Sequence, residues 1–367
     1  MRLPAPVLAF TKRHATAPTL SVYVAGGLSA PTMRGAARIV MRQQIDVARG
    51  THHVDVAGPH VFEQCVALLE QHLPTDAVMH RRGSWFCFVT EDGDVVSGNV
   101  ADSVESSVFW DVGPAVVPLL GAGVRTPAFV LLLDQEHARL CRLEDDGLTT
   151  VHDESAEPLA VVGDHMGSQP RQGFHHGTHG ETLTERAQRR RRAARERIQA
   201  SVRRVVESTI GDNGVLVVGG ADEATHALVS TLSSSAARRT VIAPDLRFET
   251  GTALATTQAR TALHQLFDRD LCRWLDVLLE DRLAAGRSAS GPAEVERALM
   301  FGDVAQLVLS RTFARRHARG AHRLALRAIG EGAAVHVASL DAAARLDVDA
   351  AGIAAELRFA LPPSATV

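Results

Sequence analysis

Two short, uninterrupted apolar runs limit the folds that this chain can adopt. The segments 128–133 and 215–218 contain no charged or polar residue. A strand without polar alternation is typical of a sheet that is covered on both faces, so both runs predict buried strands. Because helical patterns stand around them, the sequence predicts an α/β protein whose middle part is a mixed β-sheet flanked by helices.

The chain is too long for one ordinary core, since it has 367 residues. Glycine and proline interrupt the pattern near 121–127, and strands alternate with helices again in the last third. These features predict three domains: an N-terminal α+β domain over 1–123, the middle domain over 124–264, and a layered α/β/α domain over 265–367.

Periodicity also predicts the individual elements. Strands are expected at 19–24, 84–89, 128–133, 138–143, 214–218, 240–243, 305–309, 333–338 and near 357–359. Helices are expected at 34–49, 60–72, 183–208, 222–232, 256–263, 264–285, 292–301 and 321–329. The helices at 256–263 and 264–285 could equally be one continuous helix. Between 157 and 180 no periodicity is present, which predicts a long loop.

Positive charge is concentrated in the predicted helix 183–208. From Glu185 to Arg204 there are nine Arg and two Glu, a local charge of +7 in a chain of net charge −3, so the remainder sums to about −10. Thr182 and Glu185 have the spacing of a capping box that would begin this helix. An apolar stripe leaves the arginines on the other faces; its members are Ala187, Ala194, Ile198, Val202, Val205 and Val206.

Seven of these arginines are predicted to contact RNA phosphates: Arg186, Arg189, Arg190, Arg191, Arg192, Arg195 and Arg197. Solvated helices usually alternate charge so that residues four apart pair, and the two nearby acids cannot pair this run. Guanidinium groups bind phosphate through two parallel hydrogen bonds. The alternative is a solvated helix whose charges only maintain solubility.

A second basic segment supports the RNA hypothesis. Six arginines lie between Asp303 and Glu331 with no acid among them. If the segment is one helix that Gly320 does not break, four of them share a face, namely Arg315, Arg319, Arg323 and Arg327. Arg315, Arg319 and Arg323 are therefore predicted to bind RNA. Pairing with acidic residues across a domain interface is an equally open alternative.

A loop rich in glycine and histidine precedes the basic helix. Its predicted ribosome-probing residues are Gly173, His175, His176, Gly177, His179 and Gly180. His175 and His179 have the spacing of helical zinc ligands, with Asp164 and His165 near in sequence. Glycine breaks any helix here, so a polar loop that contacts RNA is favoured over a metal site, and no cofactor is predicted.

Composition excludes several classes of function. Aromatic residues make up 4% of the chain, which disfavours a surface that reads bases by stacking. The four cysteines are scattered without zinc or disulfide spacing, and no apolar run is long enough for a membrane. A cytoplasmic location is expected. Gly219-Gly220 after a strand lacks the third glycine of a dinucleotide fingerprint, and phosphate-loop and serine-hydrolase motifs are absent.

The order of these features resembles the class-I peptide chain release factor family of archaea and eukaryotes, in its bacterial branch. The segments 130–134 and 137–141 resemble the opening hairpin of the family's middle domain, and 215–220 follows the basic helix in the family's order. The segments 302–309 and 351–359 are similar to the first strand and last segment of its C-terminal domain, which has the fold of a small ribosomal protein.

The resemblance implies a tRNA-shaped protein that enters the ribosomal A site and points the loop toward the peptidyl-transferase centre. The family's Gly-Gly-Gln motif is absent between 157 and 182; the nearest strings are 167–169 and 177–181. We therefore expect a translation or hibernation factor that binds rRNA on idle or stalled ribosomes under stress, without hydrolysis. Expected partners are the ribosome, tRNA and a translational GTPase, with no membrane.

Two other functions stay open. One is a peptidyl-tRNA hydrolase or tRNA nuclease, in which Glu181 or His179 would be the general base. The other is a scaffold that binds a protein independently of the ribosome.

Overall fold

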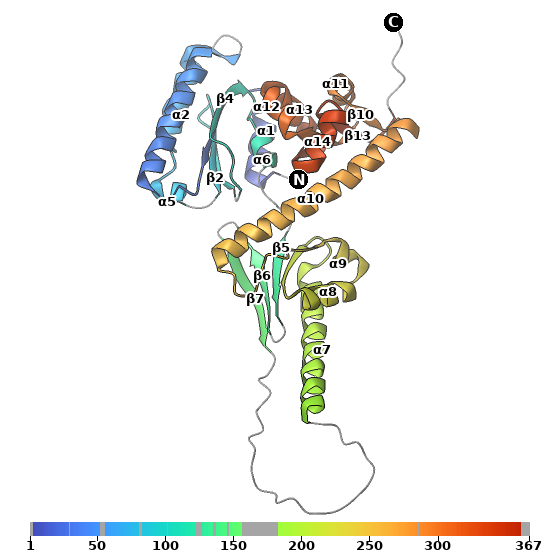
Figure 1. The fold of residues 1–367 in the computed structure, drawn as a ribbon. Helices are drawn as coiled ribbons and strands as arrows, with labels where there is room; N and C mark the ends of the chain where they lie inside the picture. The colour runs from blue at the N-terminus through green and yellow to red at the C-terminus, as the bar shows by residue number, and fades with distance from the viewer. Residues whose placement is uncertain are drawn as a thin grey trace, which may run out of the picture. The chain divides into compact units, whose positions relative to one another are not determined.

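The computed structural model describes residues 3–28, 30–51, 56–80, 83–100, 102–121, 127–134, 137–144, 147–155, 183–284 and 286–360. The chain forms two compact units. One unit combines Met1–Arg125 with Phe267–Val367, and the other comprises Thr126–Leu266. Figure 1 shows the elements of both units.

The N-terminal part of the first unit is an antiparallel sheet in the order β3-β2-β1-β4. Its elements are α1 (Ala5–Arg13), β1 (Pro18–Ala25), α2 (Pro31–Thr51), α4 (Pro59–Gln71), α5 (Asp76–His80), β2 (Ser84–Thr90), β3 (Val95–Val100), β4 (Ser107–Val112) and α6 (Val117–Gly121). Side chains of β1 alternate between two cores, since Leu20 and Val22 pack under α2 and α4 while Tyr23 faces the opposite side.

The C-terminal part of the same unit is a second sheet, in the order β10-β13-β11-β12. Its elements are β10 (Ser288–Ser290), α11 (Pro292–Met300), β11 (Val304–Ser310), α12 (Arg311–Arg316), α13 (Ala318–Gly330), β12 (Ala334–Ala338), α14 (Leu340–Asp349) and β13 (Ile353–Leu357). β11 and β12 are parallel, and β13 runs antiparallel to its neighbours. Helices cover both faces, which confirms the predicted layered α/β/α arrangement.

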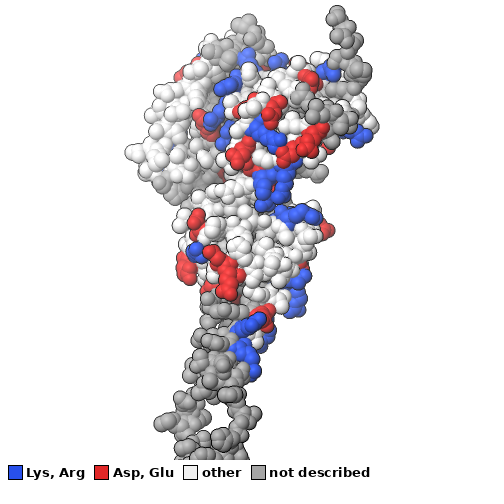
Figure 2. All heavy atoms as spheres, turned by 45° about the vertical axis from the view of Figure 1, so that its right-hand side comes forward, with Lys and Arg blue, Asp and Glu red and all other residues white. Residues whose placement is uncertain are grey.

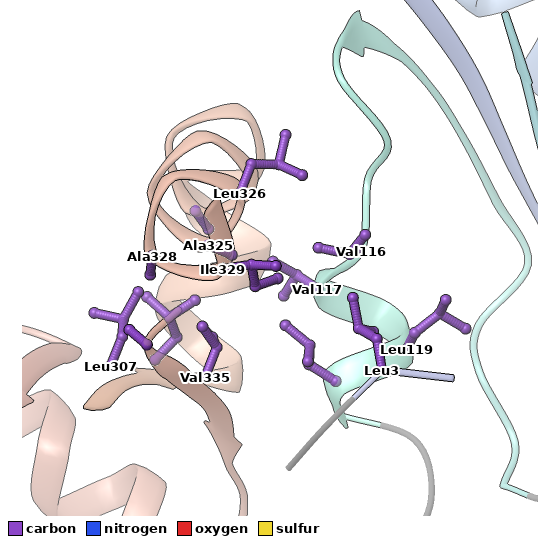
Figure 3. Packing of buried hydrophobic residues seen from close by; sticks show 14 of the residues in the cluster. Leu3, Val116, Val117, Leu119, Leu307, Ala325, Leu326, Ala328, Ile329 and Val335 are labelled. Atoms are coloured by element: carbon purple, nitrogen blue, oxygen red, sulfur yellow. The ribbon is translucent and has the colours of Figure 1, made fainter. Parts of the chain in front are cut away.

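One continuous core joins these two sheets. Leu3, Val117 and Leu119 come from the N-terminal part and pack in the same buried cluster as residues of α13 and β12 (Figure 3). Leu326 and Ile329 are two of those residues (Figure 3). The predicted division into three domains, at 1–123, 124–264 and 265–367, stays a prediction.

The second unit contains a mixed sheet, as predicted, and its strand order is β7-β6-β5-β8-β9. Its elements are β5 (Ala128–Leu133), β6 (His137–Leu143), β7 (Leu148–Ser155), α7 (Leu183–Ile210), β8 (Val215–Gly220), α8 (Asp222–Thr231), α9 (Ser234–Arg238) and β9 (Thr240–Ile242). β5 pairs antiparallel with β6 and parallel with β8. Every residue of β5 and β8 is buried, which explains why both runs lack polar alternation.

Several boundaries differ from the prediction. α10 is one helix over Thr252–Ala284, so the alternative of continuity is correct. The final strand is Ile353–Leu357 and not 357–359, because Arg358 turns out of the strand and bonds the carbonyls of Gly302 and Glu331. α1, β7, β10, α12 and α14 were not expected from the sequence.

Cys65, Cys87 and Cys141 are buried, Cys272 is half-buried, and all four thiols are free. No helix in the part of the chain that the structure describes is long and apolar enough to cross a membrane.

Candidate nucleic-acid interface

Helix α7 is anchored to the sheet through its C-terminal half. Its C-terminal half buries four side chains at intervals of four residues: Ile198, Val202, Val206 and Ile210. They pack in one cluster with Phe129, Leu140 and Leu216 of the sheet. In Figure 1 the N-terminal half of α7 extends beyond that sheet. The predicted apolar stripe is thus confirmed from Ile198 onward, while the side chains of Ala187 and Ala194 and the capping residue Thr182 lie outside the described residues.

The described side chains of the N-terminal half are exposed. They are Arg189, Arg192, Ala193, Glu196 and Arg197. The structure places the backbone of Arg186, Arg190, Arg191 and Arg195 on the same helix, and their side chains lie outside the described residues.

Among the described side chains of α7, Arg192 and Arg203 form weak ion pairs with acids one turn away. Arg192 Nε lies 3.0 Å from Glu196 Oε1, with side chains that are 83% and 64% exposed, and Arg203 lies 3.6 Å from Glu207. Exposed pairs of this kind contribute little because water screens them. Arg197 donates to the carbonyl of Ala193, a bond that leaves its positive charge uncompensated. Figure 2 shows arginine colour along α7 with a small acidic area beside it.

The second basic segment does not form one helical face, so that expectation is wrong. α12 ends at Arg316 and α13 begins at Ala318, with His317 between them at φ −122° and ψ 45°, outside helical geometry. Gly320 lies inside α13 and does not break it. Arg319, Arg323 and Arg327 therefore share a helix that Arg315 does not.

Some arginines of this segment pair with acidic residues, which agrees in part with the alternative to RNA binding. Arg315 contacts Glu105 of the N-terminal part at 3.0 Å, and Arg327 contacts Glu331 at 3.2 Å. Arg319 also has an interaction partner. Arg323 is exposed and has no ion pair within the described residues. RNA binding by Arg315, Arg319 and Arg323 stays a prediction.

The predicted loop residues Gly173, His175, His176, Gly177, His179 and Gly180, and Glu181 with them, lie outside the described residues. Among the residues that are described, no three His, Cys, Asp or Glu side chains are grouped to hold a metal ion.

The glycine pair after β8 has a packing role. Gly220 adopts φ +130°, and a Cβ there would lie 1.7 Å from the carbonyl oxygen of Leu133 on β5. Arg247 donates to the carbonyl of Gly220 at 2.8 Å. Asp222 and Glu223 occupy the first turn of α8, where negative charge is stabilising. Gly220 thus lets β8 approach β5 closely, and a Cβ at Gly219 would meet Leu246.

Comparison with known proteins gives structural likeness only. No protein family and no curated protein matches the chain. It is similar in structure to Archaeoglobus fulgidus Pelota, at 16% identity and TM-score 0.39, over 76% of this chain and 79% of that chain. It is also similar to Dom34 of S. cerevisiae, described as a translation termination-like factor, at 13% identity and TM-score 0.41, over 77% and 83% of the two chains.

A third likeness is to a model of ribosome-bound archaeal Pelota and ABCE1, at 12% identity and TM-score 0.40, over 97% and 94% of the two chains. All three TM-scores are too low to carry a functional inference, so function has to follow from the residues of this chain.

Proposed function

We propose that this protein is a release-factor-like translation factor that associates with the ribosome and binds rRNA through the N-terminal half of α7. The observation that carries the proposal is the contrast between the two halves of this helix. The C-terminal half buries its apolar stripe, whereas the arginines described toward the N-terminal end, Arg189, Arg192 and Arg197, are exposed. The sheet therefore holds the basic N-terminal half of α7, here called the cationic rod, in place.

Charge favours a polyanionic partner for this rod. Residues 183–197 contain seven Arg and two Glu, a net charge of +5. Like charges on adjacent turns repel one another, and nearby acids neutralise them only in part. Phosphate groups of RNA would remove this repulsion and would release the counterions that surround the nucleic acid.

Two structural neighbours are described in terms of the ribosome or of translation, while the proposal rests on the residues of this chain. One neighbour is a ribosome-bound Pelota, and Dom34 is described as acting in RNA quality control pathways and interacting with Hbs1. For this chain, the absence of Gly-Gly-Gln favours an occupant of idle or stalled ribosomes that does not hydrolyse peptidyl-tRNA. Membership of a bacterial branch and a role in hibernation belong to the same proposal.

Co-sedimentation with ribosomes of the source organism tests the proposal. The full-length protein is expected to pellet with ribosomes at about 50 mM salt and to lose affinity steeply toward about 200 mM. A triple variant with Arg189→Glu, Arg192→Glu and Arg197→Glu is expected to stay in the supernatant. At lower salt, where it still binds, the slope of log association constant against log salt concentration should be shallower by about 2 to 3 than for the unaltered protein.

The matched control reverses three exposed arginines elsewhere: Arg42→Glu, Arg273→Glu and Arg287→Glu. It changes the net charge equally, so it should sediment almost as the unaltered protein does. Undiminished sedimentation of the α7 variant, or an equal loss in the control, would contradict the proposal.

A further inference from the structure

A groove lies between α12 and α14, on the surface of the C-terminal part of the first unit. Its volume is about 540 Å³. α12 contributes Arg311, Arg315 and Arg316, and α14 contributes small side chains such as Ala343 together with Asp347. β11 ends at Ser310 and β12 ends at Ala338, so the groove lies beyond the carboxyl ends of two parallel strands. Open α/β sheets commonly bind ligands at this edge.

The groove carries excess positive charge. Three arginines line it against one carboxylate, and Asp347 accepts a hydrogen bond from the Ser310 hydroxyl, which holds it in place. Arg315 is paired with Glu105. Arg311 and Arg316 are exposed, and the guanidinium group of neither makes an ion pair or hydrogen bond within the described residues.

The helix ends beside the groove do not supply this charge. Asp268 of α10 accepts the backbone N–H groups of Asp341 and Ala342, at 3.2 Å and 3.3 Å. Its carboxylate therefore already caps the N-terminus of α14. Any anion in the groove would be held by the guanidinium groups of α12.

We infer that the groove binds a backbone phosphate of an RNA strand, with Arg311 and Arg316 as its ligands. This inference rests on the proposed function, which names RNA as the partner, and adds a second contact in the other unit of the chain. None of the described side chains that line the groove is aromatic, so it offers no stacking surface for the base of a free nucleotide. Guanidinium forks match the geometry of phosphate oxygens, which a backbone presents without a base.

Binding of a fluorescein-labelled oligouridylate of about 16 nucleotides to the full-length protein, followed by anisotropy, tests the inference. The double variant Arg311→Gln and Arg316→Gln is expected to bind about tenfold more weakly at about 50 mM salt, with a salt slope shallower by about 0.7, because the contact to one phosphate is lost. The control Arg42→Gln and Arg287→Gln should match the unaltered protein.

A second variant acts in the opposite direction. Glu105→Gln removes the carboxylate beside Arg315 and should strengthen RNA binding about two- to threefold. Unchanged affinity and slope in the Arg311/Arg316 variant overturn the inference, as does displacement of the oligonucleotide by AMP at an equal phosphate concentration.

The α7 variant separates this inference from the proposed function. It should retain weak oligonucleotide binding that the groove substitutions abolish. Suppose that the α7 variant no longer sediments with ribosomes, while the groove variant behaves as the unaltered protein in both assays. This result supports the proposed function and overturns the inference about the groove. If the unaltered protein binds neither ribosomes nor the oligonucleotide, both are overturned.

Discussion

Gly220 shows how one residue holds the second unit together. The parallel pairing of β5 and β8 brings its Cα against the carbonyl of Leu133, at a backbone angle that side chains rarely adopt. The sequence alone rejects a dinucleotide fingerprint at Gly219-Gly220, because the third glycine is missing, and it offers no other role for the pair. The structure supplies the physical reason for the pair, which is space.

Gly220→Ala is expected to destabilise the second unit by about 3 kcal/mol or more, because the new Cβ meets backbone and the φ angle becomes strained. Urea denaturation followed by far-ultraviolet circular dichroism measures the change. Gly251→Ala is the matched control in the same unit, since no described atom lies within 4 Å of its Cβ position. Equal stability of the two variants would refute this role.

Between elements, α13 and β4 meet at a buried histidine. The ring of His322 packs edge-on against Phe109, with centroids 4.9 Å apart. Neither ring nitrogen has a hydrogen-bond partner within the described residues. Burial lowers the pKa of His322 from 6.5 to about 4, because the charged ring would lose its hydration.

This contact predicts a loss of stability in acid. In the unfolded chain His322 takes up a proton near pH 6.5, but in the folded chain only near pH 4. The contribution of neutral His322 to the free energy of unfolding is therefore fully present above about pH 7 and is lost as the pH falls toward 4. The contribution of His322 to this fall is about 2 kcal/mol at about pH 5. Urea titrations read by tryptophan fluorescence report on this unit, since Trp85, Trp110 and Trp274 all belong to it.

His322→Leu removes the ionisable group while keeping an apolar side chain in the core. The variant should therefore lose less stability between about pH 7 and about pH 5 than the unaltered protein. An identical pH dependence in the two proteins would show that His322 is not the group responsible.

At the scale of the whole molecule, segments from the two ends of the chain share one core and form one compact unit. Leu3 and Val117 pack in the same cluster as Leu326 and Val335. The basic half of α7 belongs to the other unit and is built on a separate core. Under the proposed function, each of the two units would contribute arginines to binding of one RNA.

The whole-molecule function predicts binding without hydrolysis. Incubation of the full-length protein with ribosomes that carry peptidyl-tRNA should leave the ester intact, because no Gly-Gly-Gln stands between 157 and 182. Gel separation of peptidyl-tRNA from free tRNA measures the outcome, with sedimentation of the same samples as proof of binding. Cleavage that Glu181→Gln abolishes would instead favour the hydrolase alternative.

Local pattern was sufficient for elements whose burial is regular. β5 and β8 are apolar throughout, and α7 repeats an apolar residue every fourth position from Ile198, so each was predictable from its own residues. β7 and α14 were not. β7 is a mostly exposed edge strand of polar residues, and α14 begins at Leu340 with a positive φ and is capped by Asp268 of α10, not by a side chain near in sequence.

The sequence by itself determined which stretches must be buried and where positive charge accumulates along the chain, because both follow from residue type and spacing. Tertiary structure alone decided what each buried face packs against: the core that joins Leu3 to Leu326, and the groove in which Arg311 and Arg316 face α14. Apolar periodicity states that a face avoids water, but it carries no information on which of many apolar faces will cover it.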